Sequence, residues 1–273
     1  MIGIEKCLND VEVKDRLLEL LSAFDEICRE HGIRYSLDSG TLLGAVRHKG
    51  FIPWDDDVDL ILPRPDYDRL LNHPEWICAP YGMVSPYQRD AIQPFAKFVN
   101  WGIRAQEKEL QGVMKEYLWI DLFPADAVPD NRGDAVALCA RQAKLVKAYG
   151  RSVANPDGVE NKAKRVARKV FRPFFKLAYP QKRTLDKIMS NAAAIPYGTT
   201  KFVSNLSWPG IIKDRWFPVE DFDELIELEF EGKSFLSIPH WHEYLSGLYG
   251  DYMSLPPVDQ RISHGADVWE VQE

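Results

Sequence analysis

Four aspartates crowd into one short segment of the chain, Trp54-Asp55-Asp56-Asp57-Val58-Asp59. Alternate side chains of an extended backbone share a face, so Asp55, Asp57 and Asp59 are predicted to point the same way. Carboxylates held so close repel one another, and a bound cation relieves the repulsion. Because ligands made only of oxygen suit Mg²⁺ or Mn²⁺, the segment predicts a metal site. The alternative is a solvated acidic turn.

A candidate anion-binding turn, Ser39-Gly40-Thr41-Leu42-Leu43-Gly44, precedes the acidic segment. Backbone N–H groups at the start of a helix can bind an anion, and Gly40 lets a ligand approach the backbone closely. Arg47, further along, could bind phosphate with its guanidinium fork. We therefore predict substrate contacts at Ser39, Gly40, Thr41, Gly44 and Arg47. An anion cradle beside metal-binding acids is what phosphoryl or nucleotidyl transfer requires, although most isolated Ser-Gly turns only redirect the chain.

The elements that must position these residues are predicted from hydrophobic periodicity. Apolar residues recur at helical spacing over 11–31, and Gly32 ends that helix. A strand is expected over 33–37, a short helix over 41–47, and a strand over 58–62 that stops at Pro63. The acidic segment would then lead into a buried strand.

Downstream, strands are expected over 95–99, 103–106 and 117–123, a helical segment over 132–194, and a last helix over 241–249. We predict an α/β (α+β) fold: a mixed sheet flanked by helices, forming a single domain over 1–273. The helical segment 132–194, which is partly basic, would be an insertion within that domain.

Three segments of the chain closely resemble the signature of the LicD family: 39–59, Trp119-Ile120-Asp121-Leu122-Phe123-Pro124, and 249–257. The resemblance spans about residues 10–265. It implies a nucleotidyltransferase-like fold and a metal-dependent phosphotransferase, since the family contains phosphocholine transferases that use CDP-choline and phospho-alditol transferases related to fukutin. By the same resemblance, the acceptor would be a hydroxyl of a cell-surface glycan or its lipid-linked precursor, and CMP would be released.

The resemblance also implies roles for individual residues. Asp55, Asp57 and Asp59 would hold Mg²⁺ or Mn²⁺, and Asp121 would be a further ligand or the general base. The catalytic set is then Asp57, Asp59 and Asp121. No cysteine cluster for a structural zinc is present.

Three side chains are weaker candidates for donor contacts. Lys97 and Arg104 could bind phosphate, although charged side chains on an outward strand face are usually solvated. Trp54, with nearby aromatic residues such as Trp101, Tyr117 and Trp119, could surround a quaternary ammonium group.

The composition of the chain restricts the classes of partner that we expect and the compartment in which it works. A formal net charge of −7 argues against a nucleic-acid partner. Four scattered cysteines and the lack of a leader or membrane-spanning run favour the cytoplasm, with the inner face of the membrane as a further location. The basic stretch 162–169 permits peripheral membrane contact, but a helix packed on the domain with a solvated charged face is the favoured interpretation.

Two other functions stay open. One is a glycosyltransferase that uses Asp57-Val58-Asp59 to hold a metal and a nucleotide sugar. The other is a glycan-binding or scaffold protein without turnover.

Overall fold

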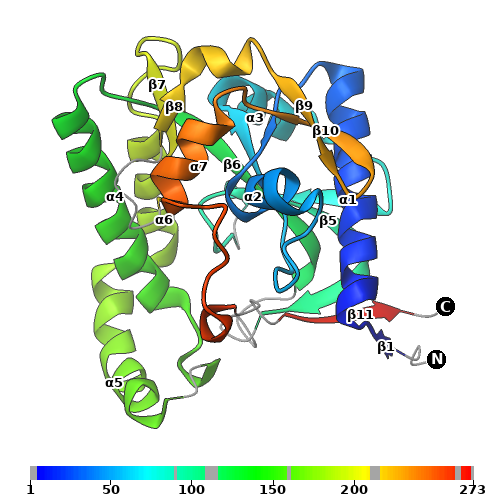
Figure 1. The fold of residues 1–273 in the computed structure, drawn as a ribbon. Coiled ribbons are helices and arrows are strands. Elements are labelled where there is room, and N and C mark those ends of the chain that lie inside the picture. The colour runs from blue at the N-terminus through cyan, green and yellow to red at the C-terminus, as the bar shows by residue number, and fades with distance from the viewer. Residues whose placement is uncertain are drawn as a thin grey trace.

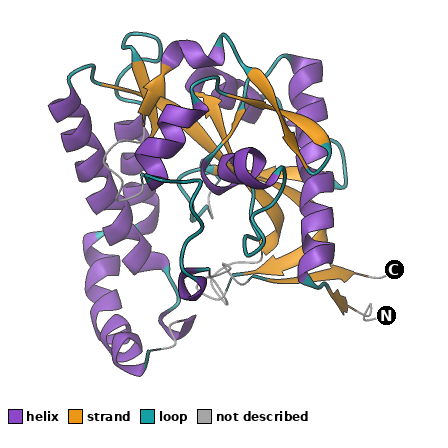
Figure 2. Ribbon diagram, in the orientation of Figure 1, coloured by secondary structure: helices purple, strands orange, loops and turns teal. Residues whose placement is uncertain are grey.

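A computed structural model describes residues 5–88, 91–107, 116–158, 161–209, 216–261 and 266–271. It shows a mixed sheet flanked by helices, which confirms the predicted fold class (Figures 1 and 2). The helices are α1 (Asp10–His31), α2 (Ser39–His48), α3 (Arg64–Asn72), α4 (Arg132–Val153), α5 (Lys162–Ala178), α6 (Gln181–Ala192) and α7 (Trp241–Tyr249).

The main sheet has nine strands within the described residues. They are β1 (Glu5–Cys7), β2 (Ser36–Leu37), β3 (Asp59–Pro63), β4 (Tyr81–Val84), β5 (Ala96–Gln106), β6 (Glu116–Val128), β7 (Phe202–Asn205), β8 (Trp216–Pro218) and β11 (Asp267–Val271). The central path runs β1-β11-β5-β6-β3-β2, with β4 beside β5, and β7 between β6 and β8. β3 runs parallel to β6, whereas β5 is antiparallel to it. A separate hairpin joins β9 (Ile226–Phe230) to β10 (Lys233–Ser237).

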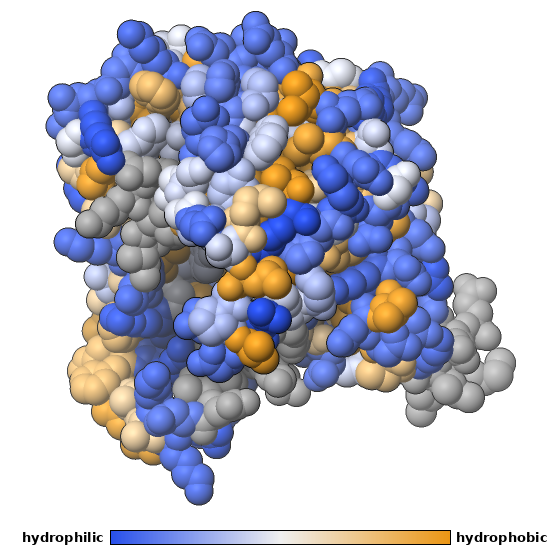
Figure 3. Space-filling model, in the orientation of Figure 1, coloured by the Kyte–Doolittle hydropathy of each residue, from blue (hydrophilic) through white to orange (hydrophobic). Residues whose placement is uncertain are grey.

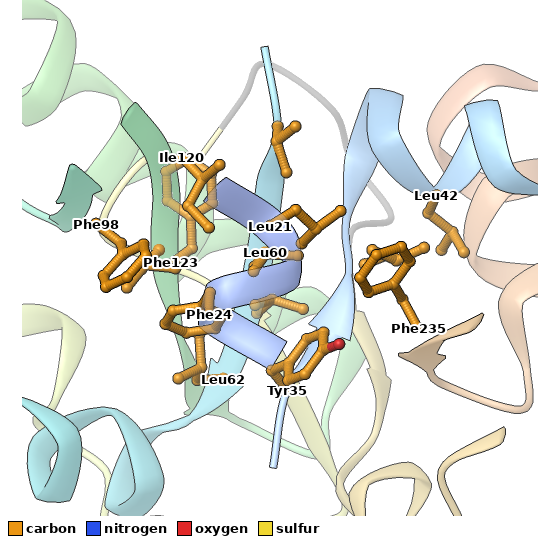
Figure 4. Close-up of a cluster of buried hydrophobic side chains, with 14 of the residues drawn as sticks. Leu21, Phe24, Tyr35, Leu42, Leu60, Leu62, Phe98, Ile120, Phe123 and Phe235 are labelled. Carbon is orange, nitrogen blue, oxygen red and sulfur yellow. The ribbon is translucent and has the colours of Figure 1, made fainter. Parts of the chain in front are cut away.

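Helix α1 covers one face of the sheet. Its N-terminus carries a capping box between Asn9 and Glu12, and it ends at Gly32, whose φ of 59° suits glycine. The helix buries an apolar stripe against the strands, and the rings of Phe24 and Phe98 meet edge to face at 5.3 Å (Figure 4). The helix predicted over 11–31 is therefore confirmed, and it backs the strands that carry the acidic residues.

The acidic segment is less regular than predicted. Strand β3 begins only at Asp59, and Asp55 and Asp57 lie in the loop before it. A turn at Pro53 and Trp54, closed by a 2.9 Å hydrogen bond from the Asp55 N–H to the Ile52 carbonyl, interrupts the extended backbone. This turn precedes Asp55, so the expectation that Asp55, Asp57 and Asp59 share a face stays a prediction, although only Asp59 lies in a regular strand.

Two further boundaries differ from the sequence-based expectation. The strand expected over 33–37 contains only Ser36 and Leu37. The strands expected over 95–99 and 103–106 are one strand, β5, with an irregularity between Asn100 and Arg104. Such a bulge changes which side chains face each side of a sheet.

Helices α4, α5 and α6 occupy the segment in which a helical insertion was expected. Helices α4 and α6 share a small apolar cluster that includes Val146, Leu185 and Ile188. Helix α5 buries none of its side chains. None of the helices in the described part of the chain combines the length and apolar composition that a bilayer crossing requires. That residues 1–273 form one domain stays a prediction.

A buried ion pair ties α3 to the sheet. Arg64 donates two hydrogen bonds to Asp126 on β6, at 2.7 and 2.8 Å, and the Asp126 side chain is 1% exposed. We expect Arg64→Met to lower the free energy of unfolding by about 3–5 kcal/mol, because it leaves a buried carboxylate without its cation. Urea unfolding would measure the change. Lys182→Met, at an exposed pair with Asp186, is the control and should cost about 0.5 kcal/mol or less; equal costs would contradict this account.

Candidate active site

Three charged side chains form a row across adjacent strands. Asp121 on β6 lies opposite Asp59 on β3 and opposite Lys97 on β5. Directly opposed residues in a sheet point to the same face. Lys97 Nζ lies 3.7 Å from Asp121 Oδ1. Strand register thus brings together residues far apart in sequence.

This row lines a cleft of about 1130 Å³. The loop before β3 contributes Asp55, Asp56 and Asp57 to the cleft, and the start of α2 contributes Ser39 and Gly40. All four predicted metal ligands, Asp55, Asp57, Asp59 and Asp121, therefore line one cavity.

The start of α2 shows a backbone conformation that is rare for its residue type. Ser39 has φ of 46°, in the left-handed region, and its side chain is buried. Such conformations cost about 1–3 kcal/mol and gather at functional sites. A Cβ atom on the next residue, Gly40, would lie 2.6 Å from Asp55 Oδ2. The lack of a side chain at Gly40 therefore lets the acidic loop come close to the helix start.

Thr41 and Gly44 have positioning roles instead of lining the cleft. The Thr41 hydroxyl accepts a 2.9 Å hydrogen bond from the Asp59 N–H and so fixes the beginning of β3. A Cβ atom on Gly44 would collide with the Gly50 carbonyl oxygen. Both residues hold the loop 49–58 against α2.

A C-terminal wall, residues 249–257, closes another side of the cleft. Arg47 donates a 2.7 Å hydrogen bond to the Tyr252 carbonyl. Arg261 donates to the Pro256 carbonyl at 2.9 Å, and its guanidinium lies over the Trp54 ring, 5.0 Å from the centroid. Arg47 and Trp54 both line the cleft, but each also anchors this wall.

Lys97 is buried among acids. Its ammonium lies 3.4 Å from Glu107, 3.9 Å from Glu116 and 3.8 Å from the centroid of the Trp119 ring. Burial lowers the pKa of Lys97, but Asp121 and the two glutamates raise it, and the net shift is upward. The interpretation of Lys97 as a solvated lysine is therefore wrong: it stays charged inside the cleft.

The acids around Lys97 are harder to ionise than usual. Burial raises the pKa of Asp121 to about 6 and that of Glu116 to about 7, and in each case the Lys97 ammonium opposes the shift. Asp121 Oδ1 is buried and accepts no hydrogen bond from any residue that the structure describes. This oxygen has the Lys97 ammonium 3.7 Å away and can still accept a hydrogen bond, for example from a hydroxyl group.

Arg104 lies elsewhere. It is exposed on β5 beyond the irregularity in that strand and does not line the cleft. Trp101 and Tyr117 likewise lie outside the cleft and pack edge to face on each other at 4.8 Å. Of the four aromatic residues suggested for an ammonium cage, Trp54 and Trp119 line the cavity.

The oxygen-rich donor set suits a hard divalent cation. In the described part of the chain, no group of three or more His, Cys, Asp or Glu side chains is already gathered so that it could hold a metal ion. The carboxylates instead line a shared cleft, and Asp121 keeps one buried oxygen without a donor. These residues fit Mg²⁺ or Mn²⁺ by their chemistry, and the metal site remains a proposal.

Sequence reasoning missed several residues of the cleft region. Glu107 lies beyond the end of a predicted strand, and Glu116 lies at the start of β6, so neither belonged to a recognisable motif. The C-terminal wall did have a signal, because 249–257 matched the family pattern, but that match suggested no role. Trp208 also lines the cleft and had no signal.

Comparisons with known proteins match the segments of the chain that line the cleft. The model of the family LicD/FKTN/FKRP, nucleotidyltransferase domain, matches residues 32–136, which include the start of α2, the acidic loop and Asp121. The lipopolysaccharide cholinephosphotransferase LicD of Haemophilus influenzae is 28% identical over 257 residues, which cover 90% of this chain and 92% of that protein. The human ribitol 5-phosphate transferase FKRP is 66% identical over 29 residues, 11% of this chain and 6% of that protein.

The chain therefore resembles the LicD family: residues 32–136 match the family model, and the resemblance to the Haemophilus influenzae protein extends over 90% of the chain.

Two glycines allow the geometry of the site to be separated from the stability of the fold. We expect Gly40→Ala to weaken Mn²⁺ binding by about tenfold with little change in Tm, because its Cβ displaces only the Asp55 carboxylate. Gly44→Ala should instead lower Tm by about 5 °C, because its Cβ meets rigid backbone. Isothermal titration with MnCl₂ and thermal unfolding would measure the two effects. The same response from both variants would argue against a separate role for Gly40.

Proposed function

We propose that this chain is a metal-dependent phosphotransferase that moves phosphocholine from CDP-choline to a hydroxyl of a cell-surface glycan or its lipid-linked precursor, releasing CMP. The observation that carries the proposal is the row of Asp59, Asp121 and Lys97 in a cleft beside the start of α2. The relative from Haemophilus influenzae, described as a cholinephosphotransferase, supports the choice of donor.

Each wall of the cleft would bind a different part of the donor. The strained start of α2, with Ser39 and Gly40, offers backbone N–H groups to the pyrophosphate. The aromatic rings of Trp54 and Tyr249, which line the same cavity, offer apolar and π surfaces for a trimethylammonium group. The volume of the cleft leaves room for the acceptor as well.

Asp55, Asp57, Asp59 and Asp121 are the residues that would hold the metal. When bound, a divalent cation would neutralise the charge of the pyrophosphate and stabilise the departing phosphate.

In the transfer step, an acceptor hydroxyl oxygen forms a bond to the phosphorus that carries choline. The bond from that phosphorus to the bridging oxygen breaks, and the electron pair leaves with CMP. Asp121 would take the hydroxyl proton, and the observation that its Oδ1 accepts no hydrogen bond from the described residues supports this role. Lys97 would hold Asp121 in place and offset the charge of the acids around it.

The cysteine pattern favours a reducing compartment, so we place the reaction in the cytoplasm, with a lipid-linked acceptor at the inner membrane face.

Phosphorus NMR tests this function directly. Purified protein would be incubated with MgCl₂, a glycan extract and, in turn, CDP-choline, CDP-ribitol, CDP-glycerol and nucleotide sugars. We expect CMP release with CDP-choline, and a decrease of at least about 10²-fold in rate for Asp57→Asn and Asp121→Asn, because each removes charge from the reacting centre. Chelation with EDTA should stop the reaction.

Asp186→Asn, an exposed substitution on α6, is the matched control and should keep full activity. Consumption of CDP-ribitol in place of CDP-choline would keep the assignment as a phosphotransferase but change the donor. Consumption of a nucleotide sugar alone would favour the glycosyltransferase. No turnover of any donor would favour a glycan-binding protein and reject the enzyme.

A further inference from the structure

Helix α5 turns its apolar side away from the protein. Four large apolar side chains follow one another at helical spacing along this side and are 55–83% exposed: Val166, Val170, Phe174 and Leu177. Pro173 and Ala163, also exposed, lie on the same side by their spacing. We call these six residues the α5 stripe. Figure 3 shows an apolar patch at the lower left, where α5 lies in Figure 1.

The opposite side of α5 faces the rest of the insertion. Arg172 donates a 3.1 Å hydrogen bond to the Val153 carbonyl at the end of α4. The Arg151 guanidinium lies over the Phe175 ring, 5.6 Å from the centroid. These contacts fix the rotation of the helix. The favoured sequence-based interpretation, an apolar face packed inward with charges outward, does not describe α5, because its inward side carries Lys164, Arg168 and Arg172 beside Phe171 and Phe175, while the α5 stripe is exposed.

The charge of α5 is of one sign. Its 17 residues include seven lysines or arginines and no aspartate or glutamate, in a chain whose net charge is −7. Lys162, Lys169 and Lys176 are spaced seven residues apart and so run along one edge of the stripe. An exposed apolar stripe edged by cations is the pattern of a helix lying in the interface of an anionic membrane.

We propose that the α5 stripe is a docking surface for an anionic lipid bilayer, with α5 lying in the plane of the headgroups. Phe174 and Leu177 would enter the acyl boundary, and Lys162 and Lys176 would contact anionic headgroups. A second copy of the chain is a poorer occupant, since two stripes face to face would bring two basic edges together. A bilayer supplies both the apolar depth and the negative charge.

A basic cavity behind α5 shares part of its lining with the catalytic cleft. It has a volume of about 570 Å³, and its lining includes Lys147, Arg151, Lys164, Arg168 and Arg172. Gln93, Glu107 and Trp208 line both this cavity and the catalytic cleft. Docking through α5 would therefore bring the cleft close to the membrane, where a lipid-carried acceptor could reach it. This last step rests on the proposed function, whereas the docking itself does not.

Vesicle flotation of the full chain tests the docking without any turnover. Vesicles of phosphatidylglycerol and phosphatidylcholine in equal parts would be compared with phosphatidylcholine alone. We expect binding to the anionic vesicles, which weakens at about 0.5 M NaCl as the charges are screened. Val170→Ser combined with Phe174→Ser should reduce the partition coefficient by at least about tenfold. Lys162→Gln combined with Lys176→Gln should reduce it by about fivefold for each charge removed.

Val11→Ser is the matched control: Val11 is 69% exposed on α1, and its substitution should leave binding unchanged. All four substituted α5 positions are exposed, and unchanged circular dichroism and Tm would confirm that the variants fold. Wild-type protein that stays off anionic vesicles would overturn the proposal, as would stripe variants that bind like wild type. The wild-type protein could instead form a dimer that binds no vesicles and that the stripe variant converts to a monomer. This result would assign the α5 stripe to a second copy of the chain and would also reject membrane docking.

Discussion

Repulsion between carboxylates is the constraint on which the rest of this structure depends. Asp55, Asp56, Asp57, Asp59 and Asp121 all line one cleft, and folding must hold them there against their mutual charge. The buried ammonium of Lys97 offsets part of that charge from the neighbouring strand. Removal from water is the main reason why the pKa values of Asp121 and Glu116 are raised, and the nearby Glu107 adds to the shift.

Local chemistry made much of the fold predictable. The capped, strongly periodic segment that forms α1, the terminal helix α7 and the strand that carries Asp121 all stand out in the sequence. The acidic loop was recognisable because crowded carboxylates repel one another, and the Ser-Gly turn gained meaning only from its position before that loop. The turn at Pro53 and Trp54 that leads into the acidic segment was not predictable from the local pattern, and neither was the start of β3 as late as Asp59.

Other features depend on tertiary contacts that no local pattern encodes. The burial of Lys97 follows from its register with Asp121, and register is set by the whole sheet. The irregularity in β5 places Arg104 outside the cleft. The direction of the α5 stripe was misjudged because an amphipathic pattern shows that a helix has an apolar and a charged face but not which face is turned inward. The contacts with α4 show this.

The bond between Arg47 and the Tyr252 carbonyl joins residues 205 positions apart. The acidic row therefore leaves the ribosome long before the wall that encloses it. While the chain is being made, its aspartates face water, which screens their repulsion, and the cleft has no closed side. A truncated mRNA that ends before the codons for residues 249–257 would yield a polypeptide that has all four predicted metal ligands but an open groove. Such a fragment would lack residues 249–257, so the cleft is enclosed on this side only with the last part of synthesis.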